Sequence, residues 1–309
     1  MSALVPDGLI KAQTEHGGPE GRAWLVELPR IVEEYLDRWR LRVDGDPGHG
    51  MGSLVLPVLR EDGTRAALKL GPVTEDNEGE SAVLRAWDGD GAVRLLELDQ
   101  ERRVLLLERL DAARPLSTVA DPWEALDILT GLLARVIAVP PPEGLRRLSD
   151  IAAAMLADVE RALPRLADPG ERALLDTCAG AVRDLVGEPG HHLLHWDLHQ
   201  GNVLASLPDS GREPWLVIDP QPLVGDPGFD LMPSLDDRWE EVVASGDVPG
   251  VVRRRFDLMT DALGLDRRRA AGWTLGRVLQ NSLWDIGGGE TSLNPEQVAI
   301  GRALLGVYA

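Results

Sequence analysis

The spacing of apolar residues changes near residue 110, and this change constrains the fold more than any other feature. Before it, short strand-like runs lie between turn signals, at 53–59, 65–70, 92–98 and 103–107. Helical spacing also occurs there, over 20–42 with an interruption near Pro29, and over 77–87. Beyond it, apolar residues recur every three or four positions, over 122–138, 149–163, 170–187, 250–264, 267–286 and 294–307. The sequence therefore predicts a small β-rich N-terminal unit, 1–110, and a larger helical unit, 111–309.

The charge of the chain limits its partners. Its 309 residues include 51 Asp and Glu against 32 Lys and Arg, a net charge of −19. Such a field repels nucleic acid and attracts small cations. We find no long apolar run and no secretion signal, and the single cysteine, Cys178, excludes an internal disulfide. We therefore expect a cytoplasmic, monomeric protein that binds neither nucleic acid nor membrane.

One polar loop carries the strongest chemical signal. Asp197 follows the apolar run 192–194, Asn202 comes five positions later, and Asp219 closes the next apolar run, 215–218. Phosphoryl transfer from ATP needs a carboxylate that orients the acceptor hydroxyl, together with amide and carboxylate oxygens that hold Mg²⁺. Isolated Asp and Asn residues often only cap turns. The complete spacing favours the catalytic interpretation.

The histidines around this loop suggest a second possibility. His191, His195 and His199 recur every four residues and would share one face of a helix, as a zinc site could require. Gly190 precedes this stretch and Gly201 follows it, so the stretch is too short for such a helix. A structural role for His195, which would brace the loop by hydrogen bonds, is the better interpretation.

Lys69 stands out because it is one of two lysines in the chain and lies in the strand-like run 65–70. In a nucleotide enzyme such a lysine contacts the ATP phosphates and pairs with a helix glutamate, for which Glu80 is the first candidate and Glu78 the second. The alternative is a lysine on an edge strand that faces water. The neighbouring catalytic pattern favours the phosphate interpretation.

A glycine-rich turn at 48–52 precedes the first strand-like run. A dinucleotide-binding fold would place a helix after such a turn, but here a strand follows it. Strand, glycine turn and strand is the arrangement of a lid over nucleotide phosphates. Gly50, Gly52 and Ser53 are therefore candidate phosphate contacts.

Taken together, these segments resemble the aminoglycoside phosphotransferases, and within them the streptomycin 6-phosphotransferase and hydroxyurea phosphotransferase subgroup. The similar segments span nearly the whole chain: 5–9, 21–24, 62–69, 194–199, 218–220, 224–230, 271–274 and 279–281. The resemblance implies an α+β, bilobal protein-kinase-like fold with a small β-rich N-terminal lobe and a larger helical C-terminal lobe.

The resemblance also implies roles for individual residues. Asp197 would be the catalytic base, Asn202 and Asp219 would bind Mg²⁺, and Lys69 with Glu80 would hold the phosphates of ATP. The adenine would lie against the backbone of the connecting segment, at Glu108 and Leu110. Asp230 would brace the catalytic loop, or would be only a helix N-terminal residue. Because Pro220 follows Asp219, in place of the Asp-Phe-Gly of protein kinases, a mobile activation segment is not expected.

For the acceptor, the C-terminal helices offer a group of polar and aromatic side chains: Gln280, Asn281, Trp284 and Asp285, with Asp226 in an earlier loop. Streptomycin carries two guanidinium groups, which pair well with carboxylates. We therefore expect the streptomycin 6-hydroxyl to be phosphorylated. Hydroxyurea is the alternative acceptor. A pseudokinase that only binds ligand is disfavoured because the lysine, the base and the metal ligands are all present.

Overall fold

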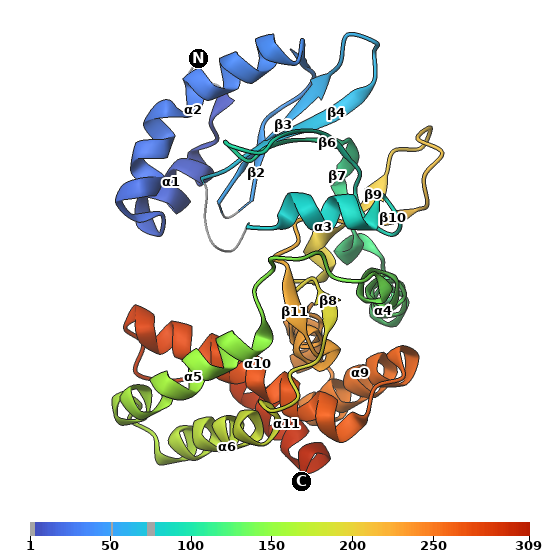
Figure 1. The fold of residues 1–309 in the computed structure, drawn as a ribbon. Coiled ribbons are helices and arrows are strands. Elements are labelled where there is room, and N and C mark those ends of the chain that lie inside the picture. The colour runs from blue at the N-terminus through green and yellow to red at the C-terminus, as the bar shows by residue number, and fades with distance from the viewer. Residues whose placement is uncertain (1–3, 51, 73–77) are drawn as a thin grey trace.

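The computed structural model describes residues 4–50, 52–72 and 78–309, which form two lobes (Figure 1). In the N-terminal lobe, an antiparallel sheet has the strand order β1-β3-β4-β6-β5, and β2 also pairs with β3. Its strands are β1 (Arg42–Val43), β2 (Gly48–His49), β3 (Leu54–Leu59), β4 (Arg65–Leu70), β5 (Leu95–Asp99) and β6 (Val104–Glu108). The helices of this lobe are α1 (Asp7–Glu15), α2 (Gly18–Arg38) and α3 (Glu80–Trp87).

Side-chain alternation along β4 gives the two faces of this sheet different partners. Leu68 and Leu70 belong to an apolar core shared with α2, whereas Ala67 belongs to a core shared with α3 and the C-terminal lobe. Because side chains alternate along a strand, Lys69 lies on the face of Ala67. The strand predicted over 65–70 is confirmed, and its geometry directs the lysine toward α3.

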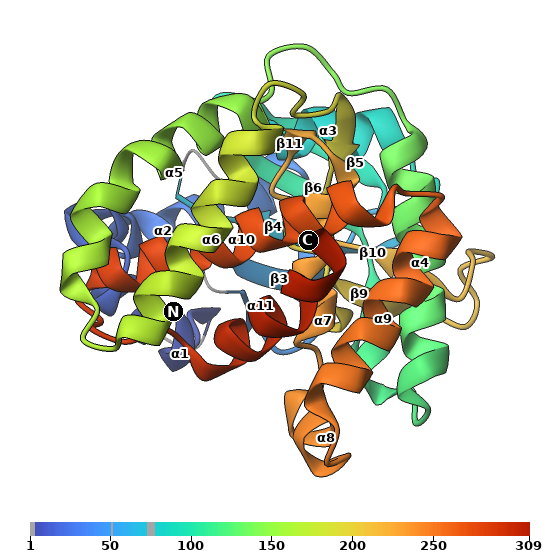
Figure 2. The ribbon, with the colours of Figure 1, turned by 90° about the horizontal axis from the view of Figure 1, so that it is seen from below.

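The C-terminal lobe is built around α10 (Arg267–Gly288), which is buried along most of its length (Figure 2). The helices around it are α4 (Pro122–Ala138), α5 (Leu148–Ala162), α6 (Pro169–Leu185), α7 (Met232–Leu235), α8 (Trp239–Ala244), α9 (Val248–Leu263) and α11 (Pro295–Tyr308). Asp-Pro pairs start some of them: the side chain of Asp121 accepts from the N–H of Trp123, and that of Asp168 from the N–H of Gly170.

Short strands position the loops that carry the predicted chemistry. β8 (His192–Leu194) pairs with β11 (Leu223–Gly225), and β9 (Val203–Ser206) lies between β7 (Leu110–Pro115) and β10 (Trp215–Val217). The loop from β8 to β9 contains Asp197 and Asn202, and Asp219 follows β10. The C-terminal ends of β8 and β10 thus bring the three side chains to one region.

Some element limits differ from the sequence prediction. The helix predicted over 20–42 begins at Gly18, continues through Pro29 and ends at Arg38, because Leu28, Val32 and Tyr35 anchor both halves in the core. Residue 77 of the helix predicted over 77–87 lies outside the described residues, and α3 begins at Glu80. Helix α1 was not predicted. Within the described ranges, no helix is both long and apolar enough to span a membrane.

Candidate active site

The catalytic loop is anchored by one buried carboxylate. Asp230 accepts hydrogen bonds from the backbone N–H groups of His195 (2.8 Å) and Trp196 (2.5 Å). These bonds support a left-handed backbone at Trp196, whose φ is 66°. Arg146 lies 4.6 Å and Arg277 5.5 Å from the centre of the Trp196 ring. The loop is therefore fixed from both its backbone and its side chains.

His195 is a structural residue of this loop. Its Nε2 donates to the carbonyl of Ile218 (2.9 Å), and its Nδ1 accepts from the N–H of Asp197 (3.3 Å). Burial lowers the pKa of His195 to about 4, so the ring is neutral. One ring nitrogen can then donate a hydrogen bond while the other accepts one. Across the residues that the structure describes, no three His, Cys, Asp or Glu side chains converge on a possible metal position. The bracing interpretation fits this geometry.

Asp197 and Asn202 face each other across the turn. The amide of Asn202 donates to the carbonyl of Asp197 (2.8 Å), and Gln221 donates to the Asp197 carboxylate (3.3 Å). Burial raises the pKa of Asp197. A partly buried carboxylate with a raised pKa, oriented by neighbouring amides, is suited to accept a proton from a hydroxyl group.

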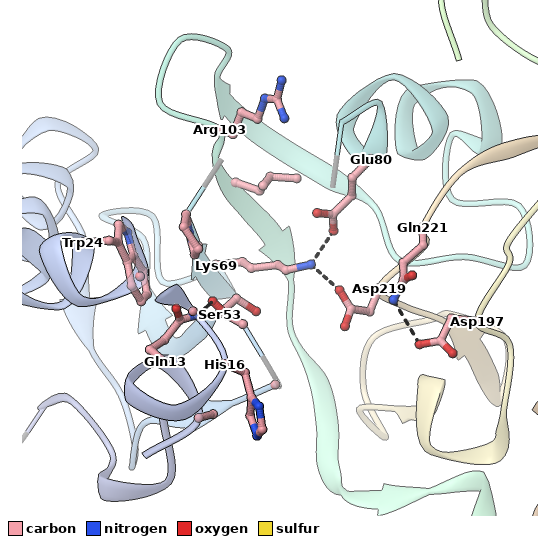
Figure 3. Close-up of a pocket in the computed structure, with 18 of the residues that line it drawn as sticks. Gln13, His16, Trp24, Ser53, Lys69, Glu80, Arg103, Asp197, Asp219 and Gln221 are labelled. Carbon is pink, nitrogen blue, oxygen red and sulfur yellow. Dashed lines mark hydrogen bonds and ion pairs between the residues drawn. The ribbon is translucent and has the colours of Figure 1, made fainter. Parts of the chain in front are cut away.

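Lys69, Glu80 and Asp219 form an ion network between the lobes (Figure 3). The Lys69 ammonium lies 2.6 Å from Glu80 Oε1 and 2.5 Å from Asp219 Oδ1. Although burial disfavours the charged lysine, the carboxylates of Asp219 and Glu80 raise its pKa overall. Lys69 in turn lowers the pKa of Asp219, whereas burial raises that of Glu80. Lys69 therefore stays charged, beside an ionised Asp219.

These groups line one cavity of about 800 Å³ between the lobes (Figure 3). Its walls include predicted site residues from both lobes: Gly50, Gly52, Ser53, Lys69, Glu80, Asp197, Asn202 and Asp219. The amide oxygen of Asn202 and the carboxylate of Asp219 are hard oxygen donors, the type that Mg²⁺ prefers. Asp219 is half exposed and uses Oδ1 for Lys69, which leaves Oδ2 available. The residues present thus fit a magnesium nucleotide.

The predicted adenine contacts do not line this cavity. The N–H of Glu108 donates to the carbonyl of Arg94 (3.0 Å), and its carboxylate accepts from Arg212 (3.0 Å). Leu110 is buried at the start of β7, paired with Ser206. The Glu108 N–H is therefore already used within the lobe, and a contact of adenine with the backbone at Glu108 and Leu110 stays a prediction.

Most predicted acceptor contacts are occupied within the protein. Asp226 accepts from the N–H of Gly228 (2.8 Å) and pairs with Arg269 (2.5 Å), so it caps a turn. Gln280 accepts from the indole of Trp196 (3.1 Å), and Asn281 donates to Gln297 (3.3 Å). These three side chains do not line the cavity, and their contact with an acceptor stays a prediction that the geometry does not favour.

Trp284 and Asp285 keep open surface at the end of α10. Trp284 is 53% exposed, and its ring centre lies 6.3 Å from that of Trp196 in the catalytic loop. Asp285 is half-buried, and burial with the nearby charge of Glu290 raises its pKa. They lie outside the cavity lining, so any contact with an acceptor would come from beyond its rim.

Sequence reasoning missed one wall of the cavity. Gln13, His16, Glu20 and Trp24 of the α1–α2 region line it, opposite Asp219 (Figure 3). The segments 5–9 and 21–24 belonged to the family resemblance, but no chemistry pointed to them. Gln221 was also missed, although it lies two positions after Asp219.

Solved structures share this fold at low sequence identity. A Plasmodium vivax ethanolamine kinase is 12% identical, with a TM-score of 0.54, and the match covers 87% of this chain and 82% of that one. A choline kinase from Streptococcus pneumoniae is 16% identical, with a TM-score of 0.53, over 91% of this chain and 99% of the other. These similarities confirm the bilobal α+β kinase fold.

Sequence relatives are much closer. A streptomycin 6-kinase of Streptomyces glaucescens is 56% identical over 98% of this chain and 97% of its own length. A hydroxyurea phosphotransferase of Kitasatospora aureofaciens is 52% identical over 98% of this chain and 86% of its own length. The family described as aminoglycoside/hydroxyurea antibiotic resistance kinases matches residues 38–289. With the cavity of Lys69, Asp197, Asn202 and Asp219 in place, the chain belongs to this kinase family.

Proposed function

We propose that the protein transfers the γ-phosphoryl group of ATP to the 6-hydroxyl of streptomycin and thereby inactivates the antibiotic. The observation that carries the chemistry is the meeting of Lys69, Asp197, Asn202 and Asp219 in one cavity. The 56% identity to streptomycin 6-kinases over nearly the full chain supports the choice of acceptor. We further propose that the protein acts as a monomer in the cytoplasm, where ATP is available.

The phosphoryl donor would be held from both lobes. Glu80 holds the Lys69 ammonium at 2.6 Å. The ammonium is thereby already oriented when the phosphates bind. Asn202 and Asp219 would hold Mg²⁺, which supplies neutralisation of the phosphate charge when bound. Asp219 Oδ1 already contacts the Lys69 ammonium. The Asp219 carboxylate would therefore position both cations that face the phosphates, the ammonium and Mg²⁺.

Asp197 would act on the acceptor. Gln221 and the amide of Asn202 hold its carboxylate and its backbone, which orients it toward an incoming hydroxyl group. The carboxylate would accept the hydroxyl proton as the oxygen attacks phosphorus. Catalysis would then depend on positioning and electrostatics, without a covalent enzyme intermediate.

The acceptor is expected to be a cation. The net charge of −19 concentrates cations near the cleft, and streptomycin carries two guanidinium groups. Among the predicted acceptor residues, Trp284 and Asp285 retain exposed surface, and we propose that they contact the acceptor from the cavity rim. Hydroxyurea is the second candidate, because one relative at 52% identity is a hydroxyurea phosphotransferase.

A coupled assay of ADP release tests the proposal, with streptomycin, other aminoglycosides and hydroxyurea as acceptors. We expect streptomycin to give the highest kcat/KM, with phosphate on its 6-hydroxyl by NMR. The Asp197→Ala variant should lose about 10²- to 10⁴-fold in kcat while binding ATP within a few-fold of wild type. If hydroxyurea gives the higher kcat/KM, it would replace streptomycin as the proposed acceptor. Absence of ADP release with every acceptor would contradict a kinase.

A further inference from the structure

Helix α1 holds the glycine turn of the N-terminal lobe at two points. The amide Nε2 of Gln13 donates to the carbonyl of Gly52 (3.0 Å). Nearer the start of α1, His49 of β2 packs against Gly8, where an added Cβ would lie 2.3 Å from the His49 ring. The helix and the hairpin β2–β3 are thus fitted to each other on both sides of the turn.

Gln13 is fixed in a notch made by two glycines. Its side chain is only 4% exposed. A Cβ added at either Gly17 or Gly21 would lie 2.2 Å from Gln13 Oε1. Within the described part of the chain, Oε1 accepts no hydrogen bond, so the bond to Gly52 is the polar contact that orients this amide. Larger residues at the two glycine positions would push the amide out of the notch.

The bond to Gly52 also sets the direction of a backbone donor. The carbonyl of Gly52 and the N–H of Ser53 belong to one planar trans peptide unit, so they point in opposite directions. With the carbonyl turned toward α1, the N–H turns away from it. Among the described residues, no hydrogen bond uses the N–H of Ser53. This donor is therefore available to a ligand.

Ser53 faces the reacting end of the cavity. A Cβ added at Gly50 would lie 3.6 Å from Ser53 Oγ and 3.8 Å from Asp219 Oδ2, so Gly50 brings the turn and the metal-binding carboxylate together. Gln13, Gly52, Ser53 and Asp219 all line the same cavity (Figure 3). Backbone N–H groups of such turns are common phosphate ligands.

We propose that Gln13 is a positioning residue of the nucleotide site, which orients the Ser53 N–H toward the phosphates of ATP through the Gly52 carbonyl. The inference rests on the proposed use of ATP. A donor oriented in advance costs no reorganisation when the phosphates arrive. Gln13 lies before residue 38, where the family match begins, so α1 adds to the site from outside the matched segment.

The Gln13→Met variant tests this role, because methionine keeps the approximate length and volume and removes the donor. Isothermal titration with ATP and Mg²⁺, and separately with adenosine, measures the two affinities. We expect the Kd of ATP to rise about fivefold, the effect of one hydrogen bond, while the Kd of adenosine stays unchanged. Gln100→Met, at an exposed glutamine, is the matched control and should leave both affinities unchanged.

A second variant approaches the same bond from the other side. Gly21→Ala displaces the Gln13 amide without changing its chemistry, and should give the same selective loss of ATP affinity. If Gln13→Met does not fold, this variant tests the role of Gln13 on its own. Equal losses for ATP and adenosine, or unchanged ATP affinity in both variants, would overturn the role of Gln13. Failure of the wild-type protein to bind ATP would instead refute the proposed function.

Discussion

Two ion networks connect the lobes. One lies inside the cavity, and the other, which we call the hinge-side network, lies beside the connecting segment at Glu108. The cavity network joins a single lysine, Lys69, to Glu80 and Asp219. On the hinge side, Arg212 lies 3.0 Å from Glu108 and donates to the carbonyls of Gly89 (2.7 Å) and Ala92 (2.9 Å). A second arginine there, Arg135, pairs with Asp90 and with Glu213.

The difference between the networks lies in the shape of the cations. Arginine offers several donors in a rigid plane, so Arg212 holds a carboxylate and two carbonyls at once, which fixes their relative positions. Lysine is a compact charge on a flexible stem, and its contacts with Glu80 and Asp219 can adjust when phosphates and Mg²⁺ enter. We infer that the hinge-side network maintains the lobe arrangement, whereas in the cavity network Glu80 keeps the Lys69 ammonium in place while the contact of Lys69 with Asp219 adjusts to the ligand.

The strongest test of this division removes a carboxylate from the cavity network. Asp219→Asn keeps the side-chain shape but weakens both the contact with Lys69 and the proposed Mg²⁺ site. We expect kcat to fall by about 10³-fold or more, in the range of other lost charge-stabilising groups, with an altered Mg²⁺ requirement. Steady-state kinetics over a Mg²⁺ titration measures both, with the exposed Asp209→Asn as control. An unchanged Mg²⁺ dependence would remove Asp219 from the metal site.

The hinge-side network should respond in stability more than in catalysis. Arg212→Met removes a cation that is 10% exposed and leaves the Glu108 carboxylate with only the N–H of Arg94 as a hydrogen-bond donor among the described residues. We expect the free energy of unfolding to fall by about 2–4 kcal/mol, since a buried carboxylate loses its compensation. The kcat of the folded enzyme should stay within a few-fold. Urea unfolding with parallel kinetics measures both, and the exposed Arg161→Met should change neither.

A catalytic effect of Arg212→Met as large as that of Asp219→Asn would contradict the division between the two networks. So would an unchanged free energy of unfolding, because the arginine would then not hold the lobes together.

The pH dependence of the free energy of unfolding tests how Asp230 supports the catalytic loop. Burial raises the pKa of Asp230 to about 7, well above the value of an unfolded aspartate. A raised pKa means that the folded protein binds the proton more tightly, so this contribution to stability is complete below about pH 4 and is lost as the pH rises through 7. The wild-type protein should lose up to about 1.4 kcal/mol per pH unit in that window from this group.

Comparison with Asp230→Asn, unfolded in urea at several pH values, separates this group from other titrating residues. The variant should show a flatter pH dependence between 5 and 7. A parallel pH dependence in the two proteins would show that Asp230 stays ionised against the N–H groups of His195 and Trp196.

The smallest expected effect concerns the cavity rim. Asp285→Asn removes one charge and should raise the KM for streptomycin about two- to fivefold, as expected for a partly exposed ion pair, without changing the KM for ATP. Added salt should lower kcat/KM for streptomycin in the wild type, because screening weakens attraction between exposed charges. A silent variant and a salt-independent kcat/KM would favour a neutral acceptor such as hydroxyurea.

The sequence predicted the parts of the site that local geometry determines. Asp197, Asn202 and Asp219 lie at fixed distances from strand ends, and strand alternation directs Lys69 toward the helix that carries Glu80. Each of these depends on a spacing of a few residues or on one pairing. The β-rich and helical units could be predicted from the periodicity of their strands and helices, whereas the kinase fold itself was implied by the family resemblance.

The acceptor residues could not be predicted in this way. Gln280 and Asn281 look polar and available, but α10 runs through the middle of its lobe, so these side chains pair with Trp196 and Gln297. Tertiary packing, which the helical period does not reveal, decides which face is open. Gln13 was missed because its partner, Gly52, is 39 residues away.

The hydrogen bonds of Val217 have a consequence for motion. Its N–H donates to Gly91 and its carbonyl accepts from Val93, both at 2.9 Å, so the end of β10 is tied to the N-terminal lobe. Asp219 follows two residues later. The intervening residue, Ile218, is tied to the catalytic loop, because its N–H donates to the carbonyl of Asn202 and its carbonyl accepts from His195, both at 2.9 Å. Asp219 thus follows a segment held by both lobes, so opening of the lobes for product release should turn about this segment and leave Asp219 close to Asp197.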